Sequence, residues 1–307
     1  MLLPVMPSSA RPRLLVPLVL AAVVAGCGER SEPLGEVTQP YPVTVQGAGD
    51  QPTVVEAPPR RIVAVDAGSA ELLRALRVGR RLVGVPAGLR AGGRAREVVR
   101  PTGQVDVGEV IRLEPDLIVG TPGTDALDVA RAQRESGARL YVQPDSSVDD
   151  VLRGTIELGF LVGEPARARQ LKARMQTQVE RVEARVVEAP VVSAFVDTGF
   201  FITIPQRSLL GDLIRRARGE SVADAAPGPE PFPISRLRQL DPDVYLATRE
   251  SRVTLQSLRA DPRTSELTAV QEGRFVLLPS DLVLRPGPRV GQALERVART
   301  LHPDAFG

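Results

Sequence analysis

The 307-residue chain has very few of the side chains on which most catalytic and metal sites depend. It contains one histidine, one cysteine, one lysine and no tryptophan. These numbers do not provide for a Ser-His-Asp triad or a three-histidine zinc site. Because the lysine, Lys172, lies within a helical pattern, there is also no Gly-Lys-Ser/Thr phosphate-binding loop. We therefore predict that the chain is not an enzyme and holds no metal or cofactor, and we expect His302, in a Leu-His-Pro tail, at the surface.

The N-terminus has the pattern of a secretory signal that ends at the only cysteine. Arg11 and Arg13 form a short basic segment, and residues 14–24 are an apolar run interrupted only by Pro17. The run is too short to cross a bilayer comfortably. It leads into Val-Ala-Gly-Cys, ending at Cys27, which resembles the lipobox of bacterial lipoproteins. The alternative is an ordinary signal followed by an unrelated cysteine.

From this pattern we predict a lipid-anchored protein on the extracytoplasmic face of the cell membrane. Residues 1–26 are the signal peptide, Cys27 is the lipidation site, and the polar, Pro/Gly-punctuated residues 27–42 are the tether. Removal of the signal takes away two arginines and no acid, so 39 basic residues become 37 against 37 acids. A neutral chain does not favour a nucleic-acid partner, which needs a basic face. We expect a monomer stabilised by its core, without disulfides.

Behind the tether, short apolar strands alternate with helical patterns. Two runs of β-branched residues, 43–45 and 53–55, flank a turn and predict a β-hairpin. The next predicted elements are strands at 62–65, 82–85, 117–119 and 139–142, with a helix at 69–77. Short apolar strands separated by helices are typical of parallel sheets that are covered on both faces. The sequence therefore predicts an α/β fold.

A segment of the chain recurs 127 residues later. Residues 108–120 and 235–247 each read as a short helix, an acidic-Pro-Asp turn and an apolar strand. The match extends to the apolar positions on both sides of the turn, so two related α/β lobes are the simplest explanation.

A long helical pattern separates the two copies. Pro165 suits a first helical turn, and apolar residues then recur at helical spacing until Pro190. A helix over 164–188 would span about 35 Å. A coiled coil is the alternative, but the apolar stripe lasts only a few turns, so we favour a rigid linker. The predicted domains are an N-terminal lobe at 43–162, a linker helix at 163–189 and a C-terminal lobe at 190–307.

The order of these motifs resembles the cobalamin/ferric-siderophore type of periplasmic binding protein. The resemblance runs from about Tyr41 to Pro303, and no single motif carries it alone. The segments that together carry the resemblance are Tyr-Pro-Val-Thr-Val at 41–45, Pro-Arg-Arg-Ile-Val-Ala-Val at 59–65, Leu-Glu-Pro-Asp-Leu-Ile at 113–118, Ser-Leu-Leu-Gly-Asp-Leu-Ile at 208–214, Leu-Asp-Pro-Asp-Val at 240–244 and Arg-Pro-Gly-Pro-Arg at 285–289. The resemblance implies two Rossmann-like lobes with parallel sheets joined by a single long backbone helix. It also implies a ligand held between the lobes and passed to the permease subunits of an ABC importer.

Candidate ligand-binding residues come from the carboxyl ends of the predicted strands, where open parallel sheets hold their ligands. Phe200 and Phe201 lie where the family places aromatic ligand contacts; the alternative is one core and one accidentally exposed ring. Arg249 and Arg285 could pair with an anionic ligand, whereas Arg289 is expected to hold the loop before the last helix. The full set is Asp66, Ser69, Thr121, Phe200, Phe201, Thr248, Arg249, Leu282 and Arg285.

The resemblance implies an iron complex, a corrinoid or heme as ligand. We expect a ferric siderophore first, then cobalamin or heme, because Leu282 stands where many cobalamin-type members carry an aromatic residue. Two further departures concern the permease. Gly108 and Ser235 occupy the positions of two glutamates that dock the family's lobes on permease arginines. Their absence motivates an alternative, a lipoprotein of the same fold that serves as a ligand sensor or interaction module without transport.

Overall fold

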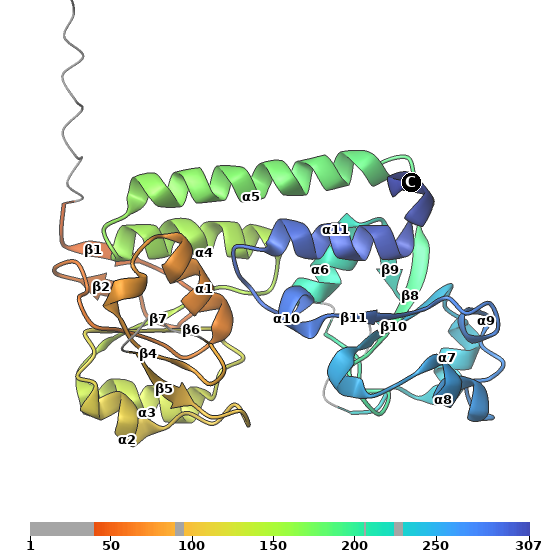
Figure 1. Cartoon of the computed structure of the whole chain (residues 1–307), viewed down its shortest axis with the longest axis horizontal. Helices are drawn as coiled ribbons and strands as arrows, with labels where there is room; N and C mark the ends of the chain where they lie inside the picture. The colour runs from red at the N-terminus through yellow and green to blue at the C-terminus, as the bar shows by residue number, and fades with distance from the viewer. Residues whose placement is uncertain (1–39, 90–94, 206, 224–229) are drawn as a thin grey trace, which may run out of the picture. The chain divides into compact units, whose positions relative to one another are not determined.

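The computed structural model describes residues 40–89, 95–205, 207–223 and 230–307. The predicted signal peptide, the predicted lipidation site at Cys27 and most of the predicted tether therefore lie outside the described residues. Residues Thr38–Gly307 form a compact unit by themselves. Within this unit, two α/β lobes with parallel sheets are joined by one long helix (Figure 1), which confirms the predicted fold class.

The N-terminal lobe contains a hairpin and a five-stranded sheet. Strands β1 (Val43–Val45) and β2 (Thr53–Val55) pair antiparallel, as the turn between the two apolar runs predicted. The parallel sheet has the order β5-β4-β3-β6-β7. Its strands are β3 (Ile62–Ala64), β4 (Leu82–Pro86), β5 (Arg96–Val99), β6 (Leu117–Gly120) and β7 (Arg139–Val142). The central strands β3 and β6 are buried throughout because helices cover both faces of the sheet.

The C-terminal lobe is built on a four-stranded parallel sheet with the order β11-β10-β8-β9. Its strands are β8 (Val192–Asp197), β9 (Gly219–Ser221), β10 (Val244–Thr248) and β11 (Phe275–Leu278). In both sheets the strand that comes first in the chain is internal, and later strands add on either side. The two sheets therefore follow a similar plan, with five strands in one and four in the other, as the internal repeat suggested.

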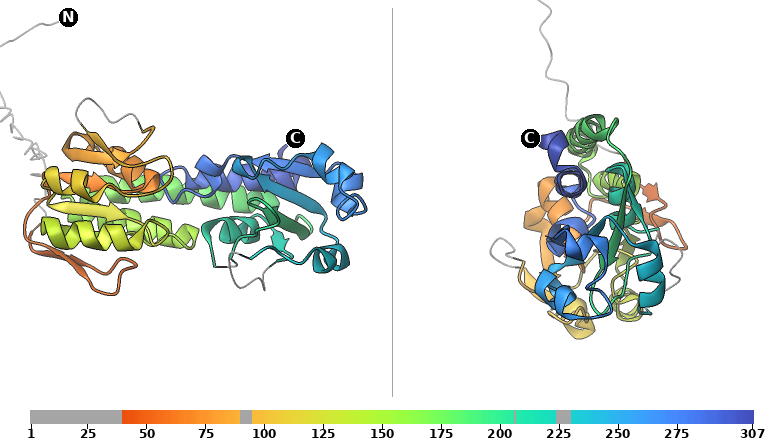
Figure 2. Two further views of the ribbon diagram at one scale, coloured as in Figure 1. Left: turned by 90° about the horizontal axis from the view of Figure 1, so that it is seen from below. Right: turned by 90° about the vertical axis from the view of Figure 1, so that its right-hand side faces the viewer.

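The helices of the N-terminal half are α1 (Ala67–Ala75), α2 (Val107–Arg112), α3 (Ala126–Ser136), α4 (Val148–Leu161) and α5 (Pro165–Val186). Those of the C-terminal half are α6 (Leu209–Arg216), α7 (Ile234–Leu240), α8 (Leu255–Ala260), α9 (Thr268–Gln271), α10 (Ser280–Val283) and α11 (Val290–Leu301). Three short 3₁₀ turns complete the described elements, at Gly79–Arg81, Arg249–Ser251 and Pro303–Phe306. Figure 1 and the left view of Figure 2 show α4 and α11 lying along opposite halves of α5, and both helices contact it.

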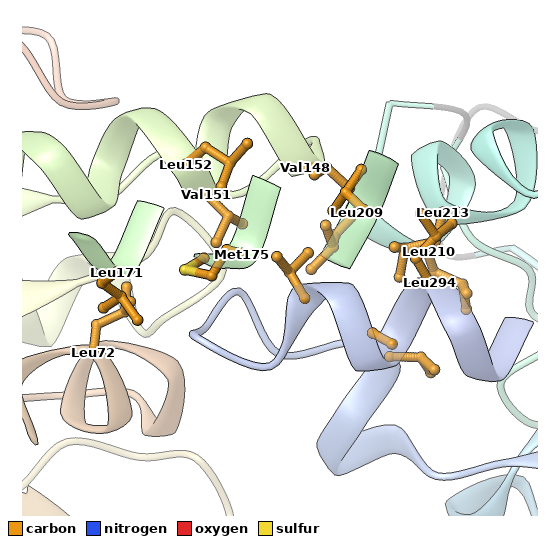
Figure 3. Packing of buried hydrophobic residues seen from close by; sticks show 14 of the residues in the cluster. Leu72, Val148, Val151, Leu152, Leu171, Met175, Leu209, Leu210, Leu213 and Leu294 are labelled. Atoms are coloured by element: carbon orange, nitrogen blue, oxygen red, sulfur yellow. The ribbon is translucent and has the colours of Figure 1, made fainter. Parts of the chain in front are cut away.

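Helix α5 begins at Pro165, which lacks the N–H that a first helical residue cannot use. Its buried residues recur at helical spacing and form one apolar face: Ala168, Leu171, Met175, Val179, Val182 and Val186. The first half packs on α4 and α1 (Leu171 near Leu72, Met175 near Val151), and the second half packs on α11 (Figure 3). One apolar cluster thus runs through both lobes along α5, while separate clusters lie on the far face of each sheet.

The repeated acidic-Pro-Asp turns form equivalent hydrogen bonds in the two lobes. Glu114 and Asp241 both adopt a left-handed backbone, with φ of 42° and 38°, directly after α2 and α7. Two residues later, the carboxylates of Asp116 and Asp243 accept hydrogen bonds from the backbone at the start of the neighbouring strand. Asp116 binds the N–H groups of Arg60 and Arg61 at 2.6 and 3.0 Å; Asp243 binds the N–H and hydroxyl of Ser193 at 2.8 and 2.7 Å.

The expected surface position of His302 is wrong. The side chain is 7 % exposed, and its Nε2 lies 2.9 Å from the carbonyl oxygen of Ala217. The residue ends α11, and its backbone N–H still bonds to Ala298 O within that helix. The ring therefore joins the end of α11 to the end of α6. The sequence around His302 could not show this burial, because the residue that covers its ring, Ala217 at the end of α6, lies 85 positions earlier in the chain.

Replacement of Asp243 by alanine is expected to lower the free energy of unfolding by about 1–3 kcal/mol, because the N–H of Ser193 loses its partner at the start of β8. Urea unfolding measures the change. The control is Asp50→Ala, at an exposed hairpin position, for which a change within about 0.5 kcal/mol is expected. Equal effects of the two substitutions would contradict the role assigned to Asp243.

Candidate functional site

The strand order of each sheet reverses at one place. In open parallel sheets, ligands bind to the loops that follow the strands at this reversal point. In the N-terminal sheet the reversal lies between β3 and β6, and in the C-terminal sheet between β8 and β10. At such a point, the loops that follow two adjacent strands run to opposite sides of the sheet. A crevice then opens between them, outside the carboxyl ends of the strands. The chain segments after these four strands begin at Val65, Thr121, Thr198 and Arg249. The predicted residues in these loops are thus positioned by strands at the two reversal points.

The loop after β3 forms the N-terminus of α1. Asp66 caps the helix, accepting hydrogen bonds from the Ser69 N–H at 2.8 Å and the Ser69 hydroxyl at 2.6 Å. Burial raises the pKa of Asp66, although the bonds from Ser69 and the nearby Arg285 act against the shift. Ser69 has no exposed surface. Its hydroxyl is therefore committed to the helix cap in this conformation and offers nothing to a ligand.

A second carboxyl group lies near Asp66. Asp145 follows β7, and the pKa of its carboxyl is raised to about 6 by burial, by the charge of Asp66 and by Asp150. Part of this carboxyl population is protonated near neutral pH, since mutual repulsion disfavours two adjacent anions. Sequence reasoning did not select Asp145, because its proximity to Asp66 depends on how β7 and β3 are placed in the sheet.

The loop after β8 presents the aromatic pair on a strained backbone. Asp197, the last residue of β8, is 1 % exposed and accepts hydrogen bonds from Gly199 N–H at 2.7 Å and Tyr245 hydroxyl at 2.7 Å. The N–H of Phe201 also donates to it, at 3.2 Å. Gly199, Phe200 and Phe201 have φ angles of 137°, 54° and 62°. A left-handed backbone costs a bulky residue about 1–2 kcal/mol. The hydrogen bonds to the buried carboxylate of Asp197 offset this cost and stabilise the loop in its left-handed conformation.

The two phenylalanines have different surroundings. Phe200 is 85 % exposed. Phe201 packs against the cluster on the outer face of the C-terminal sheet, and the guanidinium of Arg263 lies 5.6 Å from its ring centroid. One ring is therefore a core residue and the other is exposed, as the alternative interpretation allowed. The strained loop holds Phe200 outward, which gives its exposure a structural cause and keeps it as the ligand candidate of the pair.

The remaining candidates differ in what they offer. Thr121 is half-buried beside Thr124, with 3.4 Å between the hydroxyl oxygens, and Leu282 packs half-buried against the main apolar cluster. Thr248 is 2 % exposed and does not present its side chain. Arg249 is exposed and forms no ion pair within the described part of the chain. Thr121, Arg249 and Leu282 therefore stay predictions with accessible side chains.

Arg285 belongs to a direct contact between the two lobes. Its Nη1 lies 2.8 Å from Glu71 Oε1 of α1, and Arg289 Nε lies 3.1 Å from the other oxygen of the same carboxylate. Arg289 also donates to the carbonyl oxygen of Asp281 at 2.7 Å. Glu71 thus ties α1 to the segment that precedes α11. Arg285 is paired within the protein, and Arg289 does hold that segment, as expected.

Close backbone packing reinforces this contact. The carbonyl oxygen of Pro286 accepts a hydrogen bond from Gln143 Nε2 at 3.2 Å. The same carbonyl lies where a Cβ at Gly68 would have to be, so only glycine allows this approach. The carboxyl ends of β3 and β7 in one lobe therefore meet the segment after β11 and α10 of the other. We use the term lobe junction for Gly68, Glu71, Gln143 and residues 285–289.

The positions expected to dock on a permease are equivalent and exposed. Gly108 lies in the first turn of α2, and Ser235 lies in the first turn of α7. Glu109, next to the first position, forms an ion pair with Arg112 one turn later. Gly108 and Ser235 thus occupy equivalent exposed positions in the two lobes, and neither residue supplies a carboxylate there.

Two further findings concern the rest of the described chain. In the ranges listed above, no group of three or more His, Cys, Asp and Glu side chains could hold a metal ion. Within the same ranges, no helix has the length and apolar character that a membrane crossing requires.

Comparisons with known proteins agree with this geometry. Residues 62–282 match the family model described as periplasmic binding protein. The chain is 24 % identical to an uncharacterized ABC transporter substrate-binding lipoprotein of Bacillus subtilis, over 94 % of this chain and 96 % of the relative.

Solved structures share the fold. The periplasmic vitamin B12-binding protein of Vibrio cholerae superposes with a TM-score of 0.70 at 20 % identity, over 81 % of this chain and 98 % of the other. An ABC-type Fe³⁺-hydroxamate transport protein of Saccharomonospora viridis gives a TM-score of 0.69 at 22 % identity, over 85 % and 99 % of the chains. Since the family model covers most of the chain and the two-lobed architecture agrees with it, the protein belongs to the periplasmic binding protein family.

Proposed function

We propose that the chain is the solute-binding subunit of an ABC importer, anchored by Cys27 outside the cell membrane, and that it captures a metal-chelate ligand between its lobes for delivery to a permease. The observation that carries the proposal is the lobe junction, where the carboxyl ends of β3 and β7 meet residues 285–289 of the other lobe, together with the family match. Relatives named for cobalamin, vitamin B12 and Fe³⁺-hydroxamate support this ligand class.

The charges near the strand ends favour a ligand of low net charge. Arg285 and Arg289 are both occupied by Glu71, and burial raises the pKa of the neighbouring carboxyls of Asp66 and Asp145, which favours their neutral forms. Arg249 is the one candidate cation there without an ion pair in the described residues. A ferric tris-catecholate is strongly anionic and would need several free cations. We therefore propose a corrinoid or a ferric hydroxamate as ligand, in preference to a catecholate.

A thermal-shift panel tests the ligand class. The chain from Gly28 would be heated with cyanocobalamin, a neutral ferric trihydroxamate, hemin and a ferric tris-catecholate; dye fluorescence serves because there is no tryptophan. A ligand at about 100 times its Kd adds about 2.7 kcal/mol to the free energy of unfolding, or about 5 °C in Tm for a chain of this size. We expect this shift with a corrinoid or hydroxamate. A shift with the catecholate alone, or with none of the four, would refute the proposal.

Substitution of Phe200 by alanine is expected to weaken binding of the shifting ligand about tenfold, through lost aromatic contact. The Tm of the free protein should not fall, because the ring is 85 % exposed. Leu127→Ala is the matched control: Leu127 is also 85 % exposed but lies on α3. Isothermal titration measures both affinities. Unchanged affinity in the Phe200 variant would remove this residue from the site.

Cys27→Ser tests the anchor separately from the ligand. In the full chain expressed in a bacterial host, we expect the natural protein to stay with membranes during a wash in 1 M salt and the variant to be released. Salt at this concentration screens charge contacts to about 3 Å but leaves a lipid chain in place. Membrane fractionation and fatty-acid labelling provide the measurement. Equal retention and equal labelling of both forms would overturn the lipidation site.

Gly108 and Ser235 favour a second candidate, a sensor or interaction module without transport, because the exposed first turns of α2 and α7 carry no docking carboxylate. Both candidates predict ligand binding. They differ in whether uptake of the ligand by intact cells stops when the chain is deleted, which the importer requires.

A further inference from the structure

The two exposed flanks of α5 carry different charge. The helix contains six basic and two acidic residues between Pro165 and Val186. Both acids, Glu180 and Glu183, lie on the flank toward α4, where Glu183 pairs with Arg216 at 2.7 Å. The other flank carries Arg167, Arg174, Arg181 and Arg185, which we call the arginine stripe. Their spacing of seven, seven and four residues places them on one face, and all four are exposed.

The arginine stripe has few internal partners. Arg167 pairs with Glu164 just before the helix, and Arg185 lies over the ring of Phe306, 5.4 Å from its centroid. Arg174 and Arg181 form no ion pair within the described ranges. At 1.5 Å per residue, the stripe is about 27 Å long. A surface of this length with free guanidinium groups is suited to an extended array of phosphate groups, which arginine binds in a bidentate manner.

The end of the stripe borders a shallow groove between α5 and α11. The groove has a volume of about 190 Å³ and is lined by Arg181 and Arg185 from α5, by Glu295 and Arg299 from α11, and by Phe306. Arg299 pairs with Glu295 at 2.8 Å and also lies over Phe306, 4.6 Å from its centroid. Two guanidinium groups thus flank one aromatic ring at the surface. Basic residues next to apolar or aromatic ones such as phenylalanine are typical of surfaces that bind the membrane interface.

The position of the predicted tether indicates what this face meets. The described chain enters the fold at Tyr41, whose hydroxyl donates to the carbonyl oxygen of Leu161 at 3.0 Å. Leu161 ends α4, and Glu164, which precedes α5 and pairs with Arg167, also lies near the Tyr41 hydroxyl, so the tether joins the fold close to the beginning of α5. Tyr41 is fourteen positions after Cys27, a length of chain that can span at most about 50 Å. A lipid on Cys27 would therefore keep the beginning of the stripe within reach of the membrane surface.

We propose that the arginine stripe of α5 docks on anionic phospholipid headgroups of the membrane that carries the anchor. The inference rests on the proposed anchoring for its geometry, but the docking is a property of the folded chain. With the stripe on the membrane, the two flanks of α5 have different roles, since the flank toward α4 carries Glu183, which forms an ion pair with Arg216 of α6. The negative surface potential of anionic lipids attracts each nearby arginine by an amount equivalent to about a fivefold gain in partition coefficient.

Vesicle co-sedimentation of the unlipidated chain from Gly28 tests the docking, since residues Thr38–Gly307 form a compact unit by themselves. The vesicles are phosphatidylcholine alone or phosphatidylcholine with phosphatidylglycerol, at low and at high salt. We expect binding only with phosphatidylglycerol, and its loss at high salt. The triple variant Arg174→Ala, Arg181→Ala, Arg185→Ala should lower the partition coefficient about 100-fold.

The matched control removes the same charge elsewhere. Arg96, Arg134 and Arg139 are exposed on the N-terminal lobe, and their triple alanine variant should bind vesicles within about twofold of the natural chain. Circular dichroism and Tm confirm that both variants fold. Absence of binding to phosphatidylglycerol, equal binding to both vesicles, or equal loss in both variants would overturn the proposal. Because the assay uses neither lipidated Cys27 nor a ligand, its failure would leave the anchor and the ligand class to their own tests.

Discussion

The structure depends on one apolar face, that of α5, which is buried in both lobes at once. Leu171 and Met175 pack against helices of the N-terminal lobe, whereas Val182 and Val186 continue the same cluster into the C-terminal lobe. Each sheet has its own core only on its far face. A displacement of one lobe relative to the other would have to open this shared cluster and expose apolar surface, at about 25 cal/mol per Å². Large hinge motion is therefore costly in this fold, and a ligand that closes it can gain only small rearrangements.

The lobe junction adds polar constraints to that apolar one. Glu71 binds two arginines from the opposite lobe, and Gly68 lets the backbone of Pro286 approach α1. These contacts place fixed groups beside the strand ends of both sheets. They also explain why Arg285, which looked available to a ligand in the sequence, is paired in the fold. The charge that a ligand meets is thus set by the contact between lobes as much as by the loops themselves.

The sequence predicted those features that depend on local pattern. Strands β3, β4, β6 and β7, helix α1, the hairpin, the linker helix and the duplicated turn follow from periodicity, proline placement and an internal match. Features that depend on long-range contact could not be predicted: Arg285 reaches Glu71 across 214 residues, and His302 is covered by the end of α6. Phe200 and Phe201 show the limit clearly, because both have a left-handed backbone, yet one ring is exposed and the other packs against the cluster on the C-terminal sheet.

The packing of α11 on α5 also orders the events of chain assembly. All contacts of the N-terminal lobe with α4 and α5 can form once residue 186 is available, but the C-terminal cluster includes Val290, Leu294, Val297 and Leu301. The second half of α5 therefore has no cover on that side until the last residues of the chain are released. During synthesis, the N-terminal lobe can fold early, while an apolar flank of α5 stays uncovered until the terminal helix, more than one hundred residues later, has been made. That interval is when this chain most needs protection from aggregation.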